Sequence, residues 1–318
     1  MRDLPAGTQL CPDLSLIVPL YNEEENVGPL YRAVVDTLDP MGMSYEILFV
    51  DDGSRDETFL KAEKLAENDR RLRVIRFRKN YGQTPAMAAG IDHARGKILI
   101  TMDGDLQNDP ADIPKLLEKI HEGSDIVCGW RHKRQDKLIS RKIPSVIANW
   151  IIGKTTGVPI KDNGCSLKAY RAEIMKSIPL YSDMHRFIPA MTSMAGTNVA
   201  EIKVNHHPRR FGVSKYGITR IYKVMIDLLV IKTLLSFAMR PLRFFATVGM
   251  LSLVAGIFLM LESVELYEGV VEMNFMMMSG ALLFGILSFF FVLVGLLCEL
   301  VLKTGKFRDL SHVKARTE

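Results

Sequence analysis

Two long apolar stretches near the end of the chain constrain its fold more than any other feature of the sequence. Residues 242–261 carry no charge after Arg243, and residues 275–297 carry none at all. A helix of about 20 apolar residues is long enough to cross roughly 30 Å of hydrocarbon. We therefore expect two transmembrane helices; a hairpin of buried helices in a soluble core is the alternative. Two helices enclose no pore, so a protein-lined membrane cavity would require a homo-oligomer.

The charges beside these stretches predict how the chain crosses the membrane. Arg240 and Arg243 stand at the start of the first stretch. Basic residues return after the second stretch, at Lys303, Lys306 and Arg308. The loop between them contains only acidic charges, Glu262, Glu265, Glu268 and Glu272. Since Lys and Arg favour the cytoplasmic side of a cell membrane, we expect both termini in the cytoplasm and the acidic loop outside. Residues 1–13 lack the apolar segment of a signal peptide, which agrees with a cytoplasmic N-terminal domain.

Two further segments predict contact with an anionic surface. Residues 216–240 are apolar but place Arg220, Lys223 and Asp227 three and four residues apart, on one face of a helix. Such a helix would lie in the membrane interface, with a buried amphipathic core helix as the alternative. The run 131–142 holds six Lys or Arg and one Asp. It lacks the aromatic platform and motifs of nucleic-acid-binding proteins, so a membrane surface or a phosphorylated substrate is the better partner.

The first 130 residues alternate between short aliphatic runs and helical patterns. Strands are expected at 14–18, 46–50, 73–77, 97–101 and 125–128, and helices at 23–38, 55–68, 84–94 and 110–121. This alternation predicts an α/β fold with a mainly parallel sheet, in which ligands bind beyond the carboxyl ends of the strands. No GxGxxG follows the first strand, where PLYNEEE stands instead, and a dinucleotide-binding enzyme is therefore disfavoured.

Acidic side chains gather directly after two of these strands. Asp51 and Asp52 follow the second strand; Asp103 and Asp105 follow the fourth, with the amide of Gln107 two residues further on. Clustered carboxylates repel one another unless a cation joins them, and oxygen ligands favour Mg²⁺ or Mn²⁺. Such a metal commonly also binds phosphates of a substrate. A polar turn that caps the next helix is the alternative, and we expect that role for Asp52 and the nearby Ser54.

Three segments together carry a resemblance to a known family. They are VPLYNEEEN at 18–26, VDDGSRDET at 50–58 and MDGDLQ at 102–107. In this order they resemble the family 2 glycosyltransferases with a GT-A fold, and among them the polyprenyl-phosphate glycosyltransferases, bacterial relatives of dolichol-phosphate mannose synthase. The C-terminal apolar pair resembles the undecaprenyl-phosphate glucosyltransferase branch. The resemblance implies a Rossmann-like GT-A domain over 1–215, an amphipathic helix over 216–240, a transmembrane hairpin over 241–303 and a basic tail over 304–318.

The resemblance also implies how a nucleotide sugar binds. Asp51 would hydrogen-bond the nucleotide base or ribose. The loop from Pro19 through Tyr21 to Glu23 would close over the same nucleoside. Asp103 would lie against the nucleotide sugar as well as the metal.

The same resemblance implies a metal site. Asp103 and Asp105 match the DxD motif of the family, and Gln107 matches an amide that joins the metal shell. A Mg²⁺ or Mn²⁺ ion held there would bridge the nucleoside diphosphate and neutralise its charge as it leaves.

A phosphate acceptor would need cations for positioning more than a general base. Its second pKa of about 6 makes it largely a dianion at neutral pH. Arg131 follows the fifth expected strand, and Arg210 and Lys215 match the family's R-x-G-x-S-K phosphate motif. Arg suits bidentate phosphate binding. Arg209, the preceding residue, is expected to be a solvated surface charge.

The loop around Asp162 departs from the family pattern. The family usually reads D-x-x-S-G-F-K, whereas this chain has DNGCSLK at 162–168. We expect Asp162 to orient the acceptor side, with action as a base as the alternative.

His206 and His207 lack partners at metal-binding spacing and are expected to be structural. The four cysteines are widely separated and are expected to be free thiols, at Cys11, Cys128, Cys165 and Cys298.

These expectations describe an enzyme that transfers a hexose, with inversion, from UDP-glucose to undecaprenyl phosphate at the cytoplasmic membrane face. GDP-mannose and aminoarabinose donors stay open. A processive polysaccharide synthase is disfavoured, because the sequence has no Q-x-x-R-W motif and only two apolar spans. The alternative from another class is a catalytically inactive membrane protein that acts in flipping lipid-linked sugars. The intact Asp103, Asp105 and Arg210 argue against it.

Overall fold

The computed structural model of the 318-residue chain describes residues 11–132, 153, 160–178, 188–193, 196–208, 241–267 and 270–304. The chain divides into two compact units, Met1–Leu228 and Leu229–Glu318. Residues 209–240 and 305–318 lie outside the described residues. The expected interfacial helix, the basic tail and the boundaries at 215, 240 and 303 therefore stay predictions.

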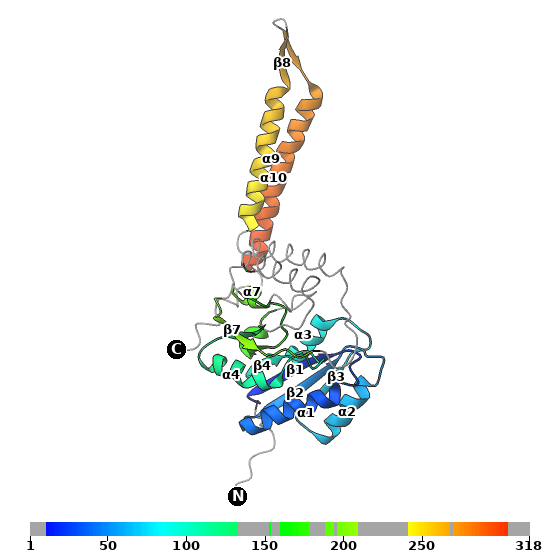
Figure 1. Ribbon diagram of the computed structural model, residues 1–318. Helices are drawn as coiled ribbons and strands as arrows, with labels where there is room; N and C mark the ends of the chain where they lie inside the picture. The colour runs from blue at the N-terminus through cyan, green and yellow to red at the C-terminus, as the bar shows by residue number, and fades with distance from the viewer. Residues whose placement is uncertain are drawn as a thin grey trace. The chain divides into compact units, whose positions relative to one another are not determined.

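A seven-stranded mixed sheet forms the centre of the first unit (Figure 1). Its strands are β1 (Leu14–Leu20), β2 (Tyr45–Asp51), β3 (Leu72–Arg76), β4 (Ile98–Thr101), β5 (Ile126–Arg131), β6 (Lys168–Arg171) and β7 (Val199–Val204). They lie in the order β3-β2-β1-β4-β6-β5-β7, and β6 alone is antiparallel to its neighbours. The five expected strands and the mainly parallel sheet are confirmed. β6 and β7 were not predicted, because neither contains a continuous aliphatic run.

Helices pack on both faces of this sheet. Successive side chains of a strand point to opposite faces, and the apolar side chains on both faces of the central strands are buried under helices. The helices expected between the first five strands are confirmed as α1 (Val27–Leu38), α2 (Thr58–Asn68), α3 (Gln83–His93) and α4 (Ile113–His121). Shorter helices are η1 (Asp39–Met41), η2 (Pro110–Asp112), α6 (Ala172–Met175) and α7 (Ile188–Ser193). On β1, Leu16 and Val18 belong to the core shared with α1 and α4. Ile17 points to the other core, with Met87 and Ile91 of α3.

The antiparallel insertion of β6 brings a distant segment to the carboxyl edge of the sheet. Because β6 runs opposite to β4 and β5, it begins where they approach their ends. Lys168, its first residue, pairs with Thr101 of β4 and with Cys128 of β5. The segment that precedes β6, with Asp162, therefore arrives beside the loops after β4 and β5.

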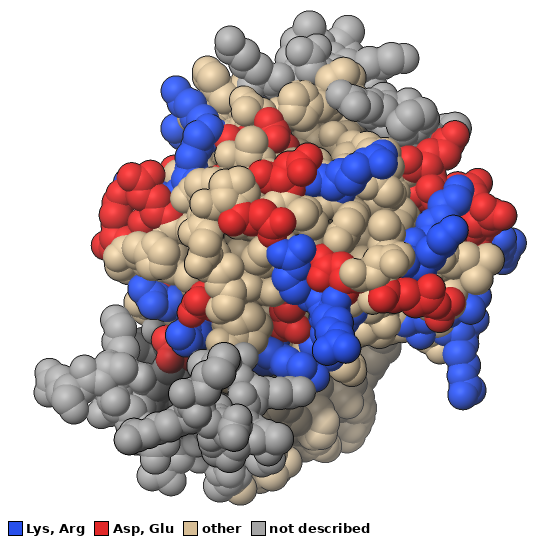
Figure 2. All heavy atoms as spheres, turned by 90° about the horizontal axis from the view of Figure 1, so that it is seen from below, with Lys and Arg blue, Asp and Glu red and all other residues tan. Residues whose placement is uncertain are grey.

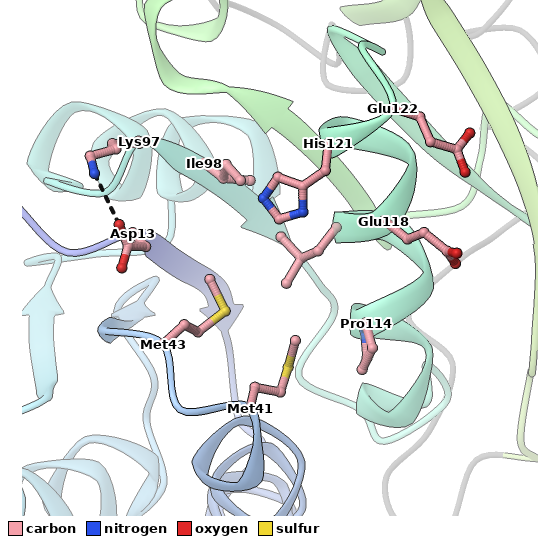
Figure 3. Close-up of a pocket in the computed structure, with 10 residues that line it drawn as sticks. Asp13, Met41, Met43, Lys97, Ile98, Pro114, Glu118, His121 and Glu122 are labelled. Atoms are coloured by element: carbon pink, nitrogen blue, oxygen red, sulfur yellow. Dashed lines mark hydrogen bonds and ion pairs between the residues drawn. The ribbon is translucent and has the colours of Figure 1, made fainter.

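The opposite, amino edge of the sheet carries an open groove of about 900 Å³ (Figure 3). Met41, Met43 and Ile98 line it, and α4 contributes His121 and Glu118 among others. These residues come from η1, from the segments at or just before the starts of β1, β2 and β4, and from α4. The groove therefore lies at the amino ends of the parallel strands, whereas the predicted chemistry is expected at their carboxyl ends.

Charges of both signs are interspersed over the face of the protein shown in Figure 2. Exposed ion pairs of the first unit include Lys61 with Glu24 at 3.3 Å and Lys97 with Asp13 at 3.0 Å. Such surface pairs contribute about 0–1 kcal/mol each, so they favour solubility more than stability.

A buried polar network also lies at the amino edge. Glu46 of β2 accepts hydrogen bonds from Ser15 Oγ at 2.7 Å and from Arg95 N at 2.6 Å, and Arg73 Nη1 lies 2.9 Å from its second oxygen. Burial alone would raise the pKa of Glu46, but these hydrogen bonds and the Arg73 charge outweigh burial and lower the pKa. One carboxylate thus joins β1, β2, β3 and the segment before β4.

We expect Glu46→Ala to lower the free energy of unfolding by about 2–4 kcal/mol, because Ser15 and Arg73 lose their buried acceptor. A lowered pKa means that the carboxylate stabilises the fold above its ordinary pKa of 4.5 and that this contribution is lost as pH falls through the folded value. Thermal unfolding of the detergent-solubilised protein should show a deficit at pH 7 that shrinks on acidification below the ordinary pKa. Glu118→Ala, on the exposed side of α4, is the matched control; equal midpoints for the two variants would contradict the prediction.

Two long helices joined by a β-hairpin form the second unit. In chain order its elements are α9 (Pro241–Glu262), β8 (Val264–Tyr267), β9 (Val270–Met273) and α10 (Phe275–Thr304). Glycine lets the helices approach: a Cβ on Gly249 would lie 3.0 Å from Ser288 O, and one on Gly256 would lie 3.1 Å from Ala281 O. Ser252 Oγ also donates to Phe284 O at 2.9 Å. Small residues and an interhelical hydrogen bond are typical of helix pairs in membranes.

Both helices are long and apolar enough to cross a membrane. Within the apolar window of each, only 17% of α9 and 11% of α10 are buried inside the protein. A core helix of a soluble protein would be mostly buried, so that alternative is disfavoured and the two apolar helices are candidate membrane spans. The acidic loop expected between them contains the β8–β9 hairpin.

Candidate active site

The candidate site starts from Asp51, the last residue of β2, whose side chain is fully buried. Its Oδ1 accepts a hydrogen bond from Ser54 N at 3.1 Å. Its Oδ2 lies 3.7 Å from Arg76 Nε and has no hydrogen-bond partner among the described residues. A buried carboxylate oxygen without a donor is costly, and such atoms are commonly satisfied by a ligand or by water. Asp51 is therefore suited to accept a hydrogen bond from a bound group.

A hollow of about 310 Å³ adjoins Asp51. It is lined by Gly53, Ser54, Arg76, Phe77 and Arg78. Arg76 also stacks on the ring of Phe59, with its guanidinium carbon 4.2 Å from the ring centroid. This hollow combines an aromatic ring and cations at the carboxyl edge, which suits a nucleotide.

The loop after β1 is bound to the loop after β2. Asn22 N donates to Ser54 Oγ at 2.9 Å, and Asn22 Oδ1 accepts from Arg55 N at 2.9 Å. Glu23 N donates to Thr58 Oγ1 at 2.8 Å, and the Glu23 side chain accepts from Asn26 Nδ2 at 2.5 Å. The segment from Pro19 through Tyr21 to Glu23 is thus held beside the Asp51 loop.

The expected N-cap role of Asp52 and Ser54 is wrong. The N-cap residue of α2 is Glu57, and Ser54 Oγ accepts from the loop after β1 instead. Asp52 accepts from Tyr81 N at 2.7 Å and Gly82 N at 2.9 Å. Burial raises the pKa of Asp52, although these two hydrogen bonds oppose the rise. Both side chains hold other loops, which no local capping rule could indicate.

The DxD loop after β4 packs tightly against the end of β1. A Cβ on Gly104 would lie 2.4 Å from Leu20 Cδ2 and 3.2 Å from Pro19 O, so a larger residue there would have to displace the Leu20 side chain. Asp105 is only 8% exposed and accepts from Gln107 N at 3.2 Å across a turn with Leu106 at φ 60°. A positive φ at leucine is strained, and such strain is common at functional sites.

Asp103, Asp105 and Gln107 lie within five residues of one another in the loop that follows β4. Asp103 Oδ1 accepts from Gln83 Nε2 at 2.6 Å. The amide nitrogen of Gln107 donates to His207 O at 3.4 Å. A cation would bind the amide oxygen of Gln107, which this hydrogen bond does not use. The described residues contain no group of three His, Cys, Asp or Glu side chains that could hold a metal alone. Two carboxylates and one amide fit Mg²⁺ or Mn²⁺, which usually keep waters and take phosphate oxygens as further ligands.

Arg131 and Asp162 form a buried bidentate pair. Arg131 Nε lies 2.7 Å from Asp162 Oδ2 and Nη2 lies 2.9 Å from Oδ1, with side chains 13% and 6% exposed. Burial alone would lower the pKa of Arg131, but its hydrogen bonds and charge interaction with Asp162 raise it. Asp103 contributes to the same electrostatic field. The two residues expected on the acceptor side therefore lie together, and a carboxylate engaged by both arms of a guanidinium favours orientation over base chemistry.

The segment after β7 is tied to the DxD loop. Asn108 and His206 form a β-bridge, and His207 N donates to Gln107 O at 2.9 Å. His207 Nε2 lies 3.2 Å from Asp109 Oδ2. Burial alone would raise the pKa of Asp109, but hydrogen bonds, from Ala111 N and then His207 and Asn205, lower it. Both histidines thus have structural contacts, as expected. Arg209, Arg210 and Lys215 follow in the sequence but lie outside the described residues.

Comparison with known sequences agrees with this arrangement. The model of the family described as Glycosyl transferase family 2 matches residues 15–178. Over 242 residues the chain is 46% identical to a dodecaprenyl-phosphate galacturonate synthase of Rhizobium johnstonii, covering 75% of this chain and 72% of that protein. Over 237 residues it is 39% identical to an undecaprenyl-phosphate 4-deoxy-4-formamido-L-arabinose transferase of Shewanella sediminis, covering 74% and 70%.

Comparison with solved structures confirms the GT-A fold. A glucosyl-3-phosphoglycerate synthase from Mycobacterium tuberculosis, crystallised with Mn²⁺, UDP and phosphoglyceric acid, aligns with a TM-score of 0.55 and 16% identity. The alignment covers 70% of this chain and 78% of that one. The family model spans 164 of 318 residues (15 through 178), and the Rhizobium relative covers three quarters of the chain. On this evidence the chain belongs to glycosyl transferase family 2.

Proposed function

We propose that this protein transfers a sugar, with inversion, from a nucleotide sugar to a polyprenyl phosphate at the cytoplasmic face of a membrane. One observation carries the proposal: Asp51 and the Asp103–Asp105 loop lie at one sheet edge in a chain 46% identical to a dodecaprenyl-phosphate galacturonate synthase. The two apolar helices would keep the enzyme at the membrane that contains such a lipid.

The donor would bind between the loops after β1, β2 and β3. Asp51 Oδ2, which accepts no hydrogen bond from the described residues, would accept one from the base or ribose. The adjoining 310 Å³ hollow would receive part of the nucleoside. The segment Pro19–Tyr21–Glu23 would cover it. Asp103, Asp105 and Gln107 would hold Mg²⁺ or Mn²⁺. This ion would neutralise charge on the leaving nucleoside diphosphate.

The acceptor phosphate would be placed by cations. Arg131, oriented by Asp162, and the motif residues Arg210 and Lys215 would bind its oxygens. One phosphate oxygen attacks the anomeric carbon opposite the diphosphate, so that a carbon–oxygen bond forms as the bond to the leaving diphosphate breaks. Because the attacking phosphate is already ionised, no proton needs to be removed.

The sugar is the open part of the proposal. Resemblance to the glucosyltransferase branch favours UDP-glucose. The names of the two sequence relatives instead favour a uronic acid or a formamido-pentose. GDP-mannose is a further candidate. A homo-oligomer is proposed because the two candidate spans in the described part of the chain enclose no cavity by themselves.

A donor screen tests this function. Purified full-length protein would be incubated with undecaprenyl phosphate, Mn²⁺ or Mg²⁺, and UDP-glucose, UDP-galacturonic acid, a UDP-4-deoxy-4-formamido-arabinose or GDP-mannose. The expected result is a lipid-phosphate-linked sugar from one donor, detected by mass spectrometry. Undecaprenol without phosphate is the matched acceptor control and should yield no product. Failure with every donor would favour the alternative function, a catalytically inactive membrane protein that acts in flipping lipid-linked sugars.

We predict that the acidic loop faces the outside of the cell and the first unit the cytoplasm. Glu262→Cys, at the exposed end of α9, should react with a membrane-impermeant maleimide in intact spheroplasts of a Cys298→Ser background. Exposed Cys11 should react only after permeabilisation. Burial raises the pKa of Cys128 to about 11 and that of Cys165 to about 12, so neither should interfere. Labelling of Cys11 in intact spheroplasts, with the thiol introduced by Glu262→Cys labelled only after permeabilisation, would show that the topology is the opposite of the predicted one.

A further inference from the structure

The loop between β3 and α3 is anchored to the end of β2. Asp52, which is 3% exposed, accepts hydrogen bonds from Tyr81 N at 2.7 Å and from Gly82 N at 2.9 Å. Gly82 is the residue before α3 and has φ 102°, a conformation that favours glycine. The Asp52 carboxylate therefore fixes the point at which α3 begins.

The neighbouring glycine lets this loop come close to β2. Gly53 has φ 67°, and a Cβ there would lie 2.4 Å from the backbone carbon of Lys79 and 2.8 Å from Asn80 N. Any other side chain would push the loop away. Asp51, Asp52 and Gly53 thus place a nucleoside-facing carboxylate and a loop anchor on three consecutive residues.

The same loop reaches the metal motif through Gln83. Gln83 is the first residue of α3, and its Nε2 donates to Asp103 Oδ1 at 2.6 Å. A hydrogen bond to a charged acceptor is among the stronger polar contacts in proteins. It holds one oxygen of Asp103 in a set orientation and leaves Oδ2 as the oxygen to meet a cation.

We propose that Gln83 is a positioning residue for Asp103, and that Asp52 holds Gln83 in place through the backbone of residues 81–82. The nucleoside-facing end and the cation-facing end of the donor site are then set by one loop. This inference rests on the proposed function, because it presumes that Asp103 binds a divalent cation together with a nucleoside diphosphate.

Mn²⁺ binding to the full-length protein in detergent, with UDP present, tests the inference without turnover. Free Mn²⁺ would be followed by electron paramagnetic resonance. Gln83→Met keeps the length of the side chain but has no donor, and we expect its Mn²⁺ dissociation constant to rise about tenfold. UDP affinity without metal and the thermal midpoint should stay at the wild-type values. Asp52→Asn, which can accept only one of the two amides well, should raise the constant severalfold. Asp92→Asn, exposed near the other end of α3, is the control and should bind as wild type.

A double-mutant comparison separates positioning from an independent effect. If Gln83 acts through Asp103, adding Gln83→Met to Asp103→Ala should not weaken Mn²⁺ binding further. Wild-type Mn²⁺ affinity in Gln83→Met, or additive losses in the double variant, would overturn the role of Gln83. Wild-type affinity in Asp52→Asn would overturn the anchoring role of Asp52. If the wild-type protein and Asp103→Ala bound Mn²⁺ equally, the metal assignment of the proposed function would fail instead.

Discussion

Sugar transfer by Asp105→Asn is expected to fall about 100- to 1000-fold while the fold is retained. Asp105 is 8% exposed, and its Oδ1 accepts from Gln107 N at 3.2 Å. The oxygen of asparagine can accept the same bond, so the strained turn at Leu106 should keep its shape. The variant loses a negative charge toward the divalent cation that would hold the diphosphate.

Initial rates measured from limiting to excess Mn²⁺ or Mg²⁺ check this expectation. Asp109→Asn is the matched control in the same loop, because the Asp109 carboxylate binds Ala111 N, Asn205 and His207. It should keep transfer within about tenfold of wild type, the change expected from one modest contact. Wild-type turnover by Asp105→Asn at limiting metal would show that the metal assignment is wrong.

Arg210→Ala is expected to damage use of the acceptor more than binding of the donor. Loss of a charge-assisted pair with a phosphate costs about 1.5–3 kcal/mol, or about tenfold to a hundredfold. The defect should appear as a raised acceptor KM or lower turnover, with nucleotide affinity nearly unchanged. Arg210→Lys should recover only part of the activity, because an ammonium cannot reproduce the bidentate contact.

Arg209→Ala is the control for this prediction, since Arg209 is expected to be a solvated charge one residue away. Steady-state kinetics with both substrates varied would compare the three variants. Equal losses in donor affinity and acceptor KM for Arg210→Ala would place Arg210 on the donor diphosphate. Normal kinetics would make it a surface charge.

The layout of the fold could be predicted because its signals are local. The aliphatic runs that became β1, β2 and β4 are buried on both faces, so each reads as a strand without knowledge of its neighbours. β6 gives no such signal: its four residues are KAYR, and it forms by pairing with β4 and β5 across long stretches of chain. A strand that forms because of its pairing with neighbouring strands, and not because of its own residue pattern, cannot be predicted from its local sequence.

In the candidate site, too, some features could be predicted from the sequence and others could not. Asp51 and Asp103 could be assigned to one edge because parallel strands end together there. The pairing of Arg131 with Asp162 could not, because it depends on the antiparallel direction of β6. Asp52 and Ser54 were misassigned for a related reason: a capping rule considers the next helix, whereas their hydrogen bonds reach residues 81–82 and 22.

The sequence by itself determined the sheet with its carboxyl-edge acidic groups, the family, and the two apolar helices, because periodicity, composition and short motifs act over a few neighbouring residues. Tertiary structure alone decided which polar groups meet: Gln83 with Asp103, Asp52 with the loop before α3, and Arg131 with Asp162. Each of these contacts joins residues 20 to 31 positions apart. Such a contact forms only after packing of the sheet and helices has brought the two loops together, and its energy depends on that burial.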